Sequence, residues 1–233
     1  MRPDARHKGR GRSTVPSFFM GFFNSLLAKM RKSLLKPAPL RRSAIAVLGR
    51  IAAASLFAIV AAKAHGRTLE EKAEICGACH GETGIPQDKA TPIIWGQQEG
   101  YLYLQLRDYK RGTRKNEQMS PIAEALERDE MFALAAYFSK KSWPDLRQPR
   151  APNEVAKRAL MANSSVGCTG CHLAEYQGAG TVPRLAGQSS DYLTKTIAEF
   201  RSRERANNPG MSDLMQATSE QDLAAVVAYL AGR

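Results

Sequence analysis

The chain has 233 residues, of which 43% are hydrophobic, 24% charged and 7% aromatic. This composition excludes wholesale disorder, and the length allows one large domain or two small ones. A formal net charge of +12 would suit a nucleic-acid ligand, but the whole excess lies in residues 1–64, which hold 13 basic residues and one acidic residue. Residues 65–233 hold 21 of each sign. We therefore predict no nucleic-acid binding.

Residues 1–64 have the features of an export signal. Basic residues up to Arg42 precede an apolar run, whose uninterrupted part is the 12 residues of Ile51–Ala62. That length suits the core of a signal peptide and falls short of the roughly 20 residues that a spanning helix needs. Small residues at Ala62 and Ala64 predict cleavage before His65 and a periplasmic protein.

Two alternatives remain open for this leader. Met30 is an alternative start, from which the leader would have a more usual length. Without cleavage, residues 43–62 would instead form an N-terminal membrane anchor. In both cases the basic residues stay on the cytoplasmic side and the rest of the chain crosses the membrane.

Residues 65–150 are predicted to form a first domain of helices and loops. Thr68 and Glu71 have the spacing of a capping box before a helix. A second helix is expected after Gly96, and a third over residues 129–139. The side chains expected on the apolar faces of these two helices are Leu102, Leu106, Tyr109, Phe132, Ala135 and Ala136.

A proline-rich linker, residues 140–153, follows, and we place the domain boundary near Arg150. Residues 151–233 are the second predicted domain. One helix is expected after Gly187, and another is expected to begin at Ser219. Their apolar faces would comprise Leu193, Ile197, Phe200, Leu223, Val226, Val227 and Leu230. No convincing strand pattern appears, so the predicted fold class is all-α.

The second domain repeats the first. The motif Cys-x-x-Cys-His at residues 76–80 recurs at 168–172, an offset of 92. Met119-Ser120 and Ala136-Tyr137 recur at the same offset, and Gly96-Gln97 and Tyr101-Leu102 recur at an offset of 91. Matching residues at a nearly constant offset along both segments indicate a tandem duplication.

All four cysteines lie in the two Cys-x-x-Cys-His motifs, which are the signature of covalent attachment of haem c. Two thiols at this spacing form thioethers with the vinyl groups of one porphyrin, and the following histidine binds the iron. We therefore predict two covalently bound haem c groups. Cys76, Cys79 and His80 would hold the first, and Cys168, Cys171 and His172 the second.

A dithiol redox pair and a zinc site are the competing interpretations of these motifs. A thioredoxin-like dithiol expects a βαβ context, which the sequence lacks. A tetrahedral zinc ion would need ligands from both domains or would leave the histidines unexplained.

The sixth ligand of each iron is found by elimination. In residues 65–233 the only histidine outside the motifs is His65, so two bis-histidine haems are impossible within this chain. A methionine thioether is the usual alternative. Met119 and Met211 have equivalent positions in the repeats, each expected in a loop after Asn116 or Asn207, and we assign them as axial ligands. Met215, one helical turn after Met211, is the alternative at the second iron.

These residues resemble the class I cytochromes c, and the duplication resembles the dihaem cytochrome c4 family. The resemblance covers residues 67–233 and rests on the two haem motifs, Met119, Met211 and the segments Pro92–Gln97 and Pro183–Gln188. It implies two haem domains whose propionate edges approach each other. It also implies that the carbonyl oxygens of Pro92 and Pro183 accept the ring N–H of the proximal histidines. Trp95 departs from the family pattern and is interpreted as a packing residue, with a role at the domain interface as the alternative.

The resemblance implies a periplasmic one-electron carrier between redox protein partners. The donor would be a quinol oxidoreductase or a dehydrogenase, and the acceptor a terminal oxidase. The alternatives are the cytochrome subunit of a dehydrogenase complex, of the flavoprotein sulfide or alcohol dehydrogenase type, and a dihaem enzyme. Two filled axial positions disfavour the enzyme. Basic side chains before each axial methionine are candidate docking charges or helix caps; they are Lys110, Arg111, Arg114, Lys115, Arg201, Arg203 and Arg205.

Overall fold

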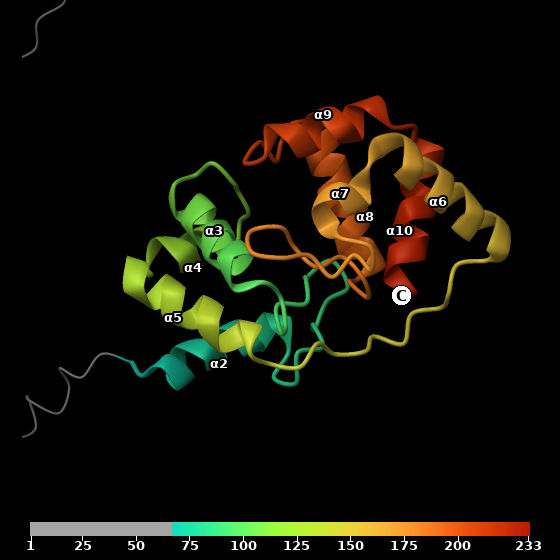
Figure 1. Cartoon of the computed structure of the whole chain (residues 1–233). Helices are drawn as coiled ribbons and strands as arrows, with labels where there is room; N and C mark the ends of the chain where they lie inside the picture. The colour runs from blue at the N-terminus through green and yellow to red at the C-terminus, as the bar shows by residue number, and fades with distance from the viewer. Residues whose placement is uncertain (1–66) are drawn as a thin grey trace, which may run out of the picture. The chain divides into compact units, whose positions relative to one another are not determined.

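The computed structural model describes residues 67–233, which belong to one compact unit (Figure 1). The predicted leader, its cleavage site before His65 and the apolar residues 43–62 lie outside this range. Within the described range, no helix combines the length and apolar character that a membrane span requires. The same residues form helices and loops, with a single isolated β-bridge between Ala179 and Val182.

The first repeat contains four helices, α2 (Leu69–His80), α3 (Glu99–Lys110), α4 (Met119–Glu124) and α5 (Arg128–Ser139). The predicted capping box begins α2: Thr68 Oγ1 accepts the N–H of Glu71 at 3.2 Å, and the Glu71 carboxylate accepts the N–H of Thr68 at 2.8 Å. α5 packs against α2 and α3. The buried core of this repeat comprises Ala73, Leu102, Leu134, Ala135 and Phe138.

One apolar face was predicted wrongly. Phe132 of α5 is exposed, whereas Met131 and Leu134 are buried. The ring of Phe132 stacks on Tyr103 of α3, with centroids 3.8 Å apart, and the guanidinium group of Arg128 lies 5.5 Å from the centroid of the same ring. The apolar stripe of α5 is therefore shifted by one position, and an aromatic stack covers its solvent edge.

The second repeat contains five helices, α6 (Asn153–Val166), α7 (Cys168–His172), α8 (Ser190–Arg201), α9 (Pro209–Ala217) and α10 (Glu220–Ala231). α10 packs against α6 and α8. Gly167, with φ of +78°, ends α6 immediately before the cysteine motif. The equivalent residue of the first repeat is Ile75, and there α2 continues through the motif without a break. Glycine adopts this left-handed conformation readily, which explains why the helix divides only in the second repeat.

The linker joins the two repeats without a helix, as predicted, and extends to Pro152. Gly96 and Gly187 are equivalent turns with φ of +66° and +75°, and both lie against Trp143 of the linker. A Cβ atom on Gly96 would lie 2.9 Å from the backbone nitrogen of Trp143, and one on Gly187 would lie 3.0 Å from its Nε1. The linker thus packs against the same turn in both repeats.

Candidate haem sites

The two motif histidines have the same surroundings. His80 ends α2 and His172 ends α7, and both are buried. The Nδ1 atom of His80 lies 2.8 Å from the carbonyl oxygen of Pro92, and that of His172 lies 2.9 Å from the carbonyl oxygen of Pro183. Burial lowers the pKa of both rings, against the opposing effect of these carbonyl contacts. A neutral ring that donates from Nδ1 leaves Nε2 free to bind iron.

The four cysteines form no disulfide with one another. In each motif the first cysteine is half-buried and the second is exposed. Burial raises the pKa of Cys76 to about 11, so that its thiol is protonated at neutral pH. The helical turn of each motif therefore presents two reduced thiols and one histidine ring from a single short segment.

The two methionines predicted as axial ligands occupy equivalent helix starts. Met119 begins α4, and its N–H donates to Asn116 Oδ1 at 2.9 Å. Met211 lies in the first turn of α9, and its N–H donates to Asn208 Oδ1 at 3.2 Å. The segments predicted as loops thus begin short helices, and Asn208, the equivalent of Asn116, accepts the N–H in the second repeat. Asparagine favours the start of a helix because its side chain satisfies an otherwise unbonded N–H.

Met215 is more deeply buried than Met211, although both contact the same hydrophobic cluster. It is buried in a cluster with Phe200 and Leu223, and the equivalent position in the first repeat is Ala123, which carries no sulfur. Both Met211 and Met215 line the same cavity, so the structure leaves each within reach of a group bound there.

A cavity of about 920 Å³ extends through both repeats. This volume lies at the upper end of the range of about 300–1,000 Å³ that is typical of ligand sites. Its lining includes both motif histidines and both predicted axial methionines. The remaining walls are mainly apolar side chains of α3, α8, α10 and the proline segments, among them Leu102, Ile93, Leu193 and Val226.

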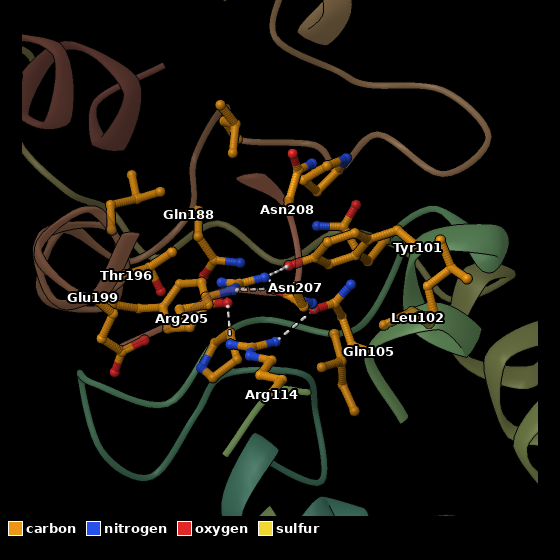
Figure 2. A pocket seen from close by; sticks show the side chains of 18 of the residues that line it. Tyr101, Leu102, Gln105, Arg114, Gln188, Thr196, Glu199, Arg205, Asn207 and Asn208 are labelled. Atoms are coloured by element: carbon orange, nitrogen blue, oxygen red, sulfur yellow. Dashed lines mark hydrogen bonds between the residues drawn. The ribbon is translucent and has the colours of Figure 1, made fainter. Parts of the chain in front are cut away.

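Arginine and tyrosine side chains from both repeats meet where this cavity crosses between them (Figure 2). Arg114 donates to Tyr192 Oη, and Arg205 donates to Tyr101 Oη, both at 3.2 Å. Gln105 Oε1 accepts from Arg114 at 3.0 Å and from Arg205 at 2.9 Å. We call these five residues the arginine–tyrosine cluster. Its contacts are reciprocal, since each arginine reaches the tyrosine of the other repeat.

Positive charge exceeds negative charge in this cluster. Arg114 and Arg205 are 7% and 4% exposed, and within residues 67–233 neither forms a salt bridge. Nη1 of Arg205 is buried without a hydrogen-bond partner in that range. Burial opposes ionisation of Tyr192, but the two guanidinium groups outweigh it and lower its pKa to about 7. Buried cations need anionic partners, so these residues fit a ligand that brings carboxylates, as the propionates of haem do.

The predicted docking charges divide into three groups. Arg114 and Arg205 are buried in the arginine–tyrosine cluster, so their interpretation as surface docking charges was wrong. Lys110 and Arg201 cap helices: Lys110 donates to the carbonyl oxygens of Glu124 and Leu126, and Arg201 to those of Met215 and Thr218. Arg111, Lys115 and Arg203 are exposed.

Trp95 packs within the first repeat. Its ring lies partly buried against the core of that repeat, beside Gly84 and under the ammonium group of Lys141. The packing interpretation agrees with this position.

Sequence analysis did not assign a function to Gln97 and Gln188, which the structure places at the contact between the repeats. Each bonds to the backbone of the opposite repeat, next to the proline that faces a motif histidine. Their recurrence as Gly-Gln after each proline segment was visible in the sequence and was the available signal.

Three comparisons agree on the relatives of this chain. Residues 157–233 match the family model of cytochrome c. Cytochrome c4 of Thiocapsa roseopersicina is 36% identical over 168 residues, which cover 68% of this chain and 86% of that protein. A Stutzerimonas stutzeri protein named thiosulfate dehydrogenase electron acceptor is 34% identical over 167 residues, which cover 67% of this chain and 77% of that protein. The solved structure of Acidithiobacillus ferrooxidans cytochrome c4 has a TM-score of 0.62 and 30% identity, over 68% of this chain and 98% of that one. These similarities confirm the predicted all-α fold with two cytochrome c-like haem domains.

Proposed function

Because the chain belongs to the cytochrome c4 family, we propose that it is a periplasmic dihaem carrier in which His80 and Met119 bind one iron and His172 and Met211 the other. The chain is an electron-transfer protein with covalently bound haem c, and not a catalytic enzyme. The observation that carries the ligand assignment is the duplicated arrangement around the cavity. Each repeat brings to it a motif histidine bonded to a proline carbonyl and a methionine on an asparagine-capped helix.

Each bound haem supplies the exchange of one electron between Fe(III) and Fe(II). The protein holds each haem through the thioethers of Cys76 and Cys79 or of Cys168 and Cys171. The proline carbonyl fixes the ring of the proximal histidine and increases its basicity. The methionine sulfur favours the ferrous state and so raises the reduction potential.

Met211 is the better candidate for the second iron for two reasons. Its position and its cap repeat those of Met119, whereas Met215 corresponds to an alanine. Met215 is also buried within the cluster of Phe200 and Leu223, whereas Met211 packs against that cluster while remaining only partly buried. With a histidine and a methionine on each iron, no coordination position remains for a substrate.

The arginine–tyrosine cluster is the proposed site of the haem carboxylates. Arg114 and Arg205 would hold the propionate edges of the two haems, with Tyr101 and Tyr192 as further donors. This arrangement would neutralise the buried guanidinium groups and bring the two haems edge to edge, so that electrons pass between the repeats.

Axial ligation is tested by an optical redox titration of the matured protein with its methionine variants. Two one-electron transitions, both with the far-red sulfur-to-iron band in the ferric protein, support the proposal. Met119→Ala and Met211→Ala should each remove the band at one haem, and the matched control Met215→Leu should retain both. Met119→His and Met211→His supply a nitrogen ligand and guard against loss of folding. Retention of the band in Met211→Ala with loss in Met215→Leu would instead assign Met215.

A periplasmic dehydrogenase is the electron donor that the relatives favour. The Stutzerimonas stutzeri relative is named as the electron acceptor of thiosulfate dehydrogenase, and it covers most of this chain. We propose that this protein accepts electrons from a dehydrogenase of that type or from a quinol oxidoreductase, and passes them to a terminal acceptor. Stopped-flow reduction of this protein by each donor decides between them.

The N-terminal sequence of the exported protein tests cleavage before His65. A start at Met1 or Met30, with residues 43–62 retained, would instead support a membrane anchor.

A further inference from the structure

Two buried glutamines connect each repeat to the peptide backbone of the other. Gln97 is 3% exposed and Gln188 is 2% exposed. Gln188 Oε1 accepts the N–H of Ile93 at 2.9 Å, and its Nε2 donates to the carbonyl oxygen of Ile93 at 3.1 Å. Gln97 does the same with Arg184, at 2.7 and 3.0 Å. Each side chain amide thus exchanges two hydrogen bonds with one residue of the opposite repeat.

The N–H groups that these glutamines bind belong to the peptide units that face the haem ligands. The N–H of Ile93 and the carbonyl of Pro92 form one peptide unit, and that carbonyl oxygen lies 2.8 Å from His80 Nδ1. In the other repeat the N–H of Arg184 and the carbonyl of Pro183 form the equivalent unit, 2.9 Å from His172 Nδ1. A peptide unit is planar and conjugated, so its two ends are coupled.

A continuous chain of hydrogen bonds therefore begins on a glutamine of one repeat and ends on the proximal histidine of the other. Acceptance of the N–H proton by the glutamine oxygen increases the electron density on the carbonyl oxygen of the same peptide unit. Hydrogen bonds in such chains strengthen one another in a dry interior. The histidine then donates a stronger hydrogen bond from Nδ1 and becomes a better electron donor to iron.

We infer that Gln188 sets the reduction potential of the haem in the first repeat, and that Gln97 sets that of the haem in the second. Both are positioning residues, because they act on the iron only through a proline carbonyl and a histidine ring. The bond they strengthen favours Fe(III), so each glutamine lowers the potential of the opposite haem. Contact between the repeats is thus part of the tuning of each redox centre. This inference depends on the proposed ligation by His80 and His172.

Gln98 provides a matched comparison. It also reaches the opposite repeat, where its Nε2 donates to the carbonyl oxygens of Gln177 and Gly178 at 2.9 and 3.3 Å. It contacts neither peptide unit that faces a histidine. Replacement of Gln98 therefore removes bonds between the repeats without breaking either chain of bonds to the iron.

The test replaces each glutamine by methionine, which has a similar shape and cannot accept these bonds. The potential of each haem is measured by redox titration, and the ring nitrogens of His80 and His172 are followed by NMR after labelling with ¹⁵N-histidine. In Gln188→Met we expect the Fe(III)/Fe(II) equilibrium of the first haem to shift about threefold to tenfold toward Fe(II), tenfold being about 59 mV. The Nδ1 signal of His80 should move with it. Gln97→Met should shift the second haem and His172, and Gln98→Met neither.

The crossed pattern distinguishes tuning from a structural role. A shift confined to the haem of the substituted repeat, equal shifts at both haems, or an equal effect of Gln98→Met would overturn the inference. If one variant does not fold, the other tests the same chain of bonds in the opposite direction. Ligation is checked separately, because the ring signals of the unaltered protein show whether both histidines bind iron before any glutamine is replaced.

Discussion

Replacement of Arg205 by methionine tests the energetic role of the arginine–tyrosine cluster. Arg205 is 4% exposed and donates to Tyr101, Gln105 and Asn207 at 3.2, 2.9 and 3.2 Å. Hydrogen bonds from a charged group contribute about 1.5–3 kcal/mol each. Methionine also removes the desolvation cost of the guanidinium, which amounts to several kcal/mol. The free energy of unfolding should therefore fall by about 2–4 kcal/mol. This corresponds to about a 30-fold to 700-fold change in the unfolding equilibrium constant.

The matched control is Arg203→Met, two residues earlier in the chain. Arg203 has a side chain that is 53% exposed, and its contact with Asp213 at 2.7 Å is on the surface. Such surface pairs contribute about 0–1 kcal/mol. Urea unfolding of the haem-loaded proteins, followed by far-ultraviolet circular dichroism and by haem absorbance, measures both variants. A loss in Arg205→Met that is no larger than in Arg203→Met would refute the reasoning.

Three further substitutions test the loop that contains Gly178 and Gly180 and one surface contact. Gly178→Ala should lower the free energy of unfolding, measured in urea, by about 3 kcal/mol or more. The reason is that Gly178 has a φ of +66° and that a Cβ atom there would lie 2.4 Å from the carbonyl carbon of Pro183. Gly180→Ala, with φ of +59° and nothing within 4 Å, should lose only about 1–2 kcal/mol, and equal losses would contradict the steric argument. A hydrogen bond from Lys72 holds the pKa of Glu130 below its ordinary value, so its contribution is full above the ordinary pKa of glutamate and is lost as pH falls through the lowered pKa. Glu130→Gln should therefore be less stable than the unaltered protein at neutral pH and equal to it in acid, and an equal difference at both pH values would rule out this contact as the cause.

The sequence was sufficient to predict the helical fold, the duplication and the haem motifs because each depends on local spacing. Thr68 and Glu71 identify a capping box without knowledge of the rest of the fold, and the structure contains it. The cysteine and histidine positions follow equally from one short motif. The haem-binding roles proposed for them need only the geometry of a single helical turn.

The contact between the repeats could not be predicted in the same way. Arg114 and Arg205 look like surface residues in a basic stretch, and only the packing of one repeat on the other buries them. Phe132 was misplaced because a shift of one position along a helix rotates a side chain by about 100°, which is enough to move it off the buried face of α5. The roles of Gln97 and Gln188 depend on partners 87 and 95 residues away, which no local pattern specifies.

The reciprocal contacts also bear on how this chain originated. Arg114 bonds to Tyr192 while Arg205 bonds to Tyr101, and the two pairs exchange when positions are shifted by one repeat. A surface that binds its own copy in this manner is isologous, as in a two-fold homodimer. The ancestral domain would thus have paired with itself before gene fusion joined the two partners. After such a fusion the two halves would be free to differ, and here Gln105 accepts hydrogen bonds from both arginines while its equivalent in the second repeat is Thr196.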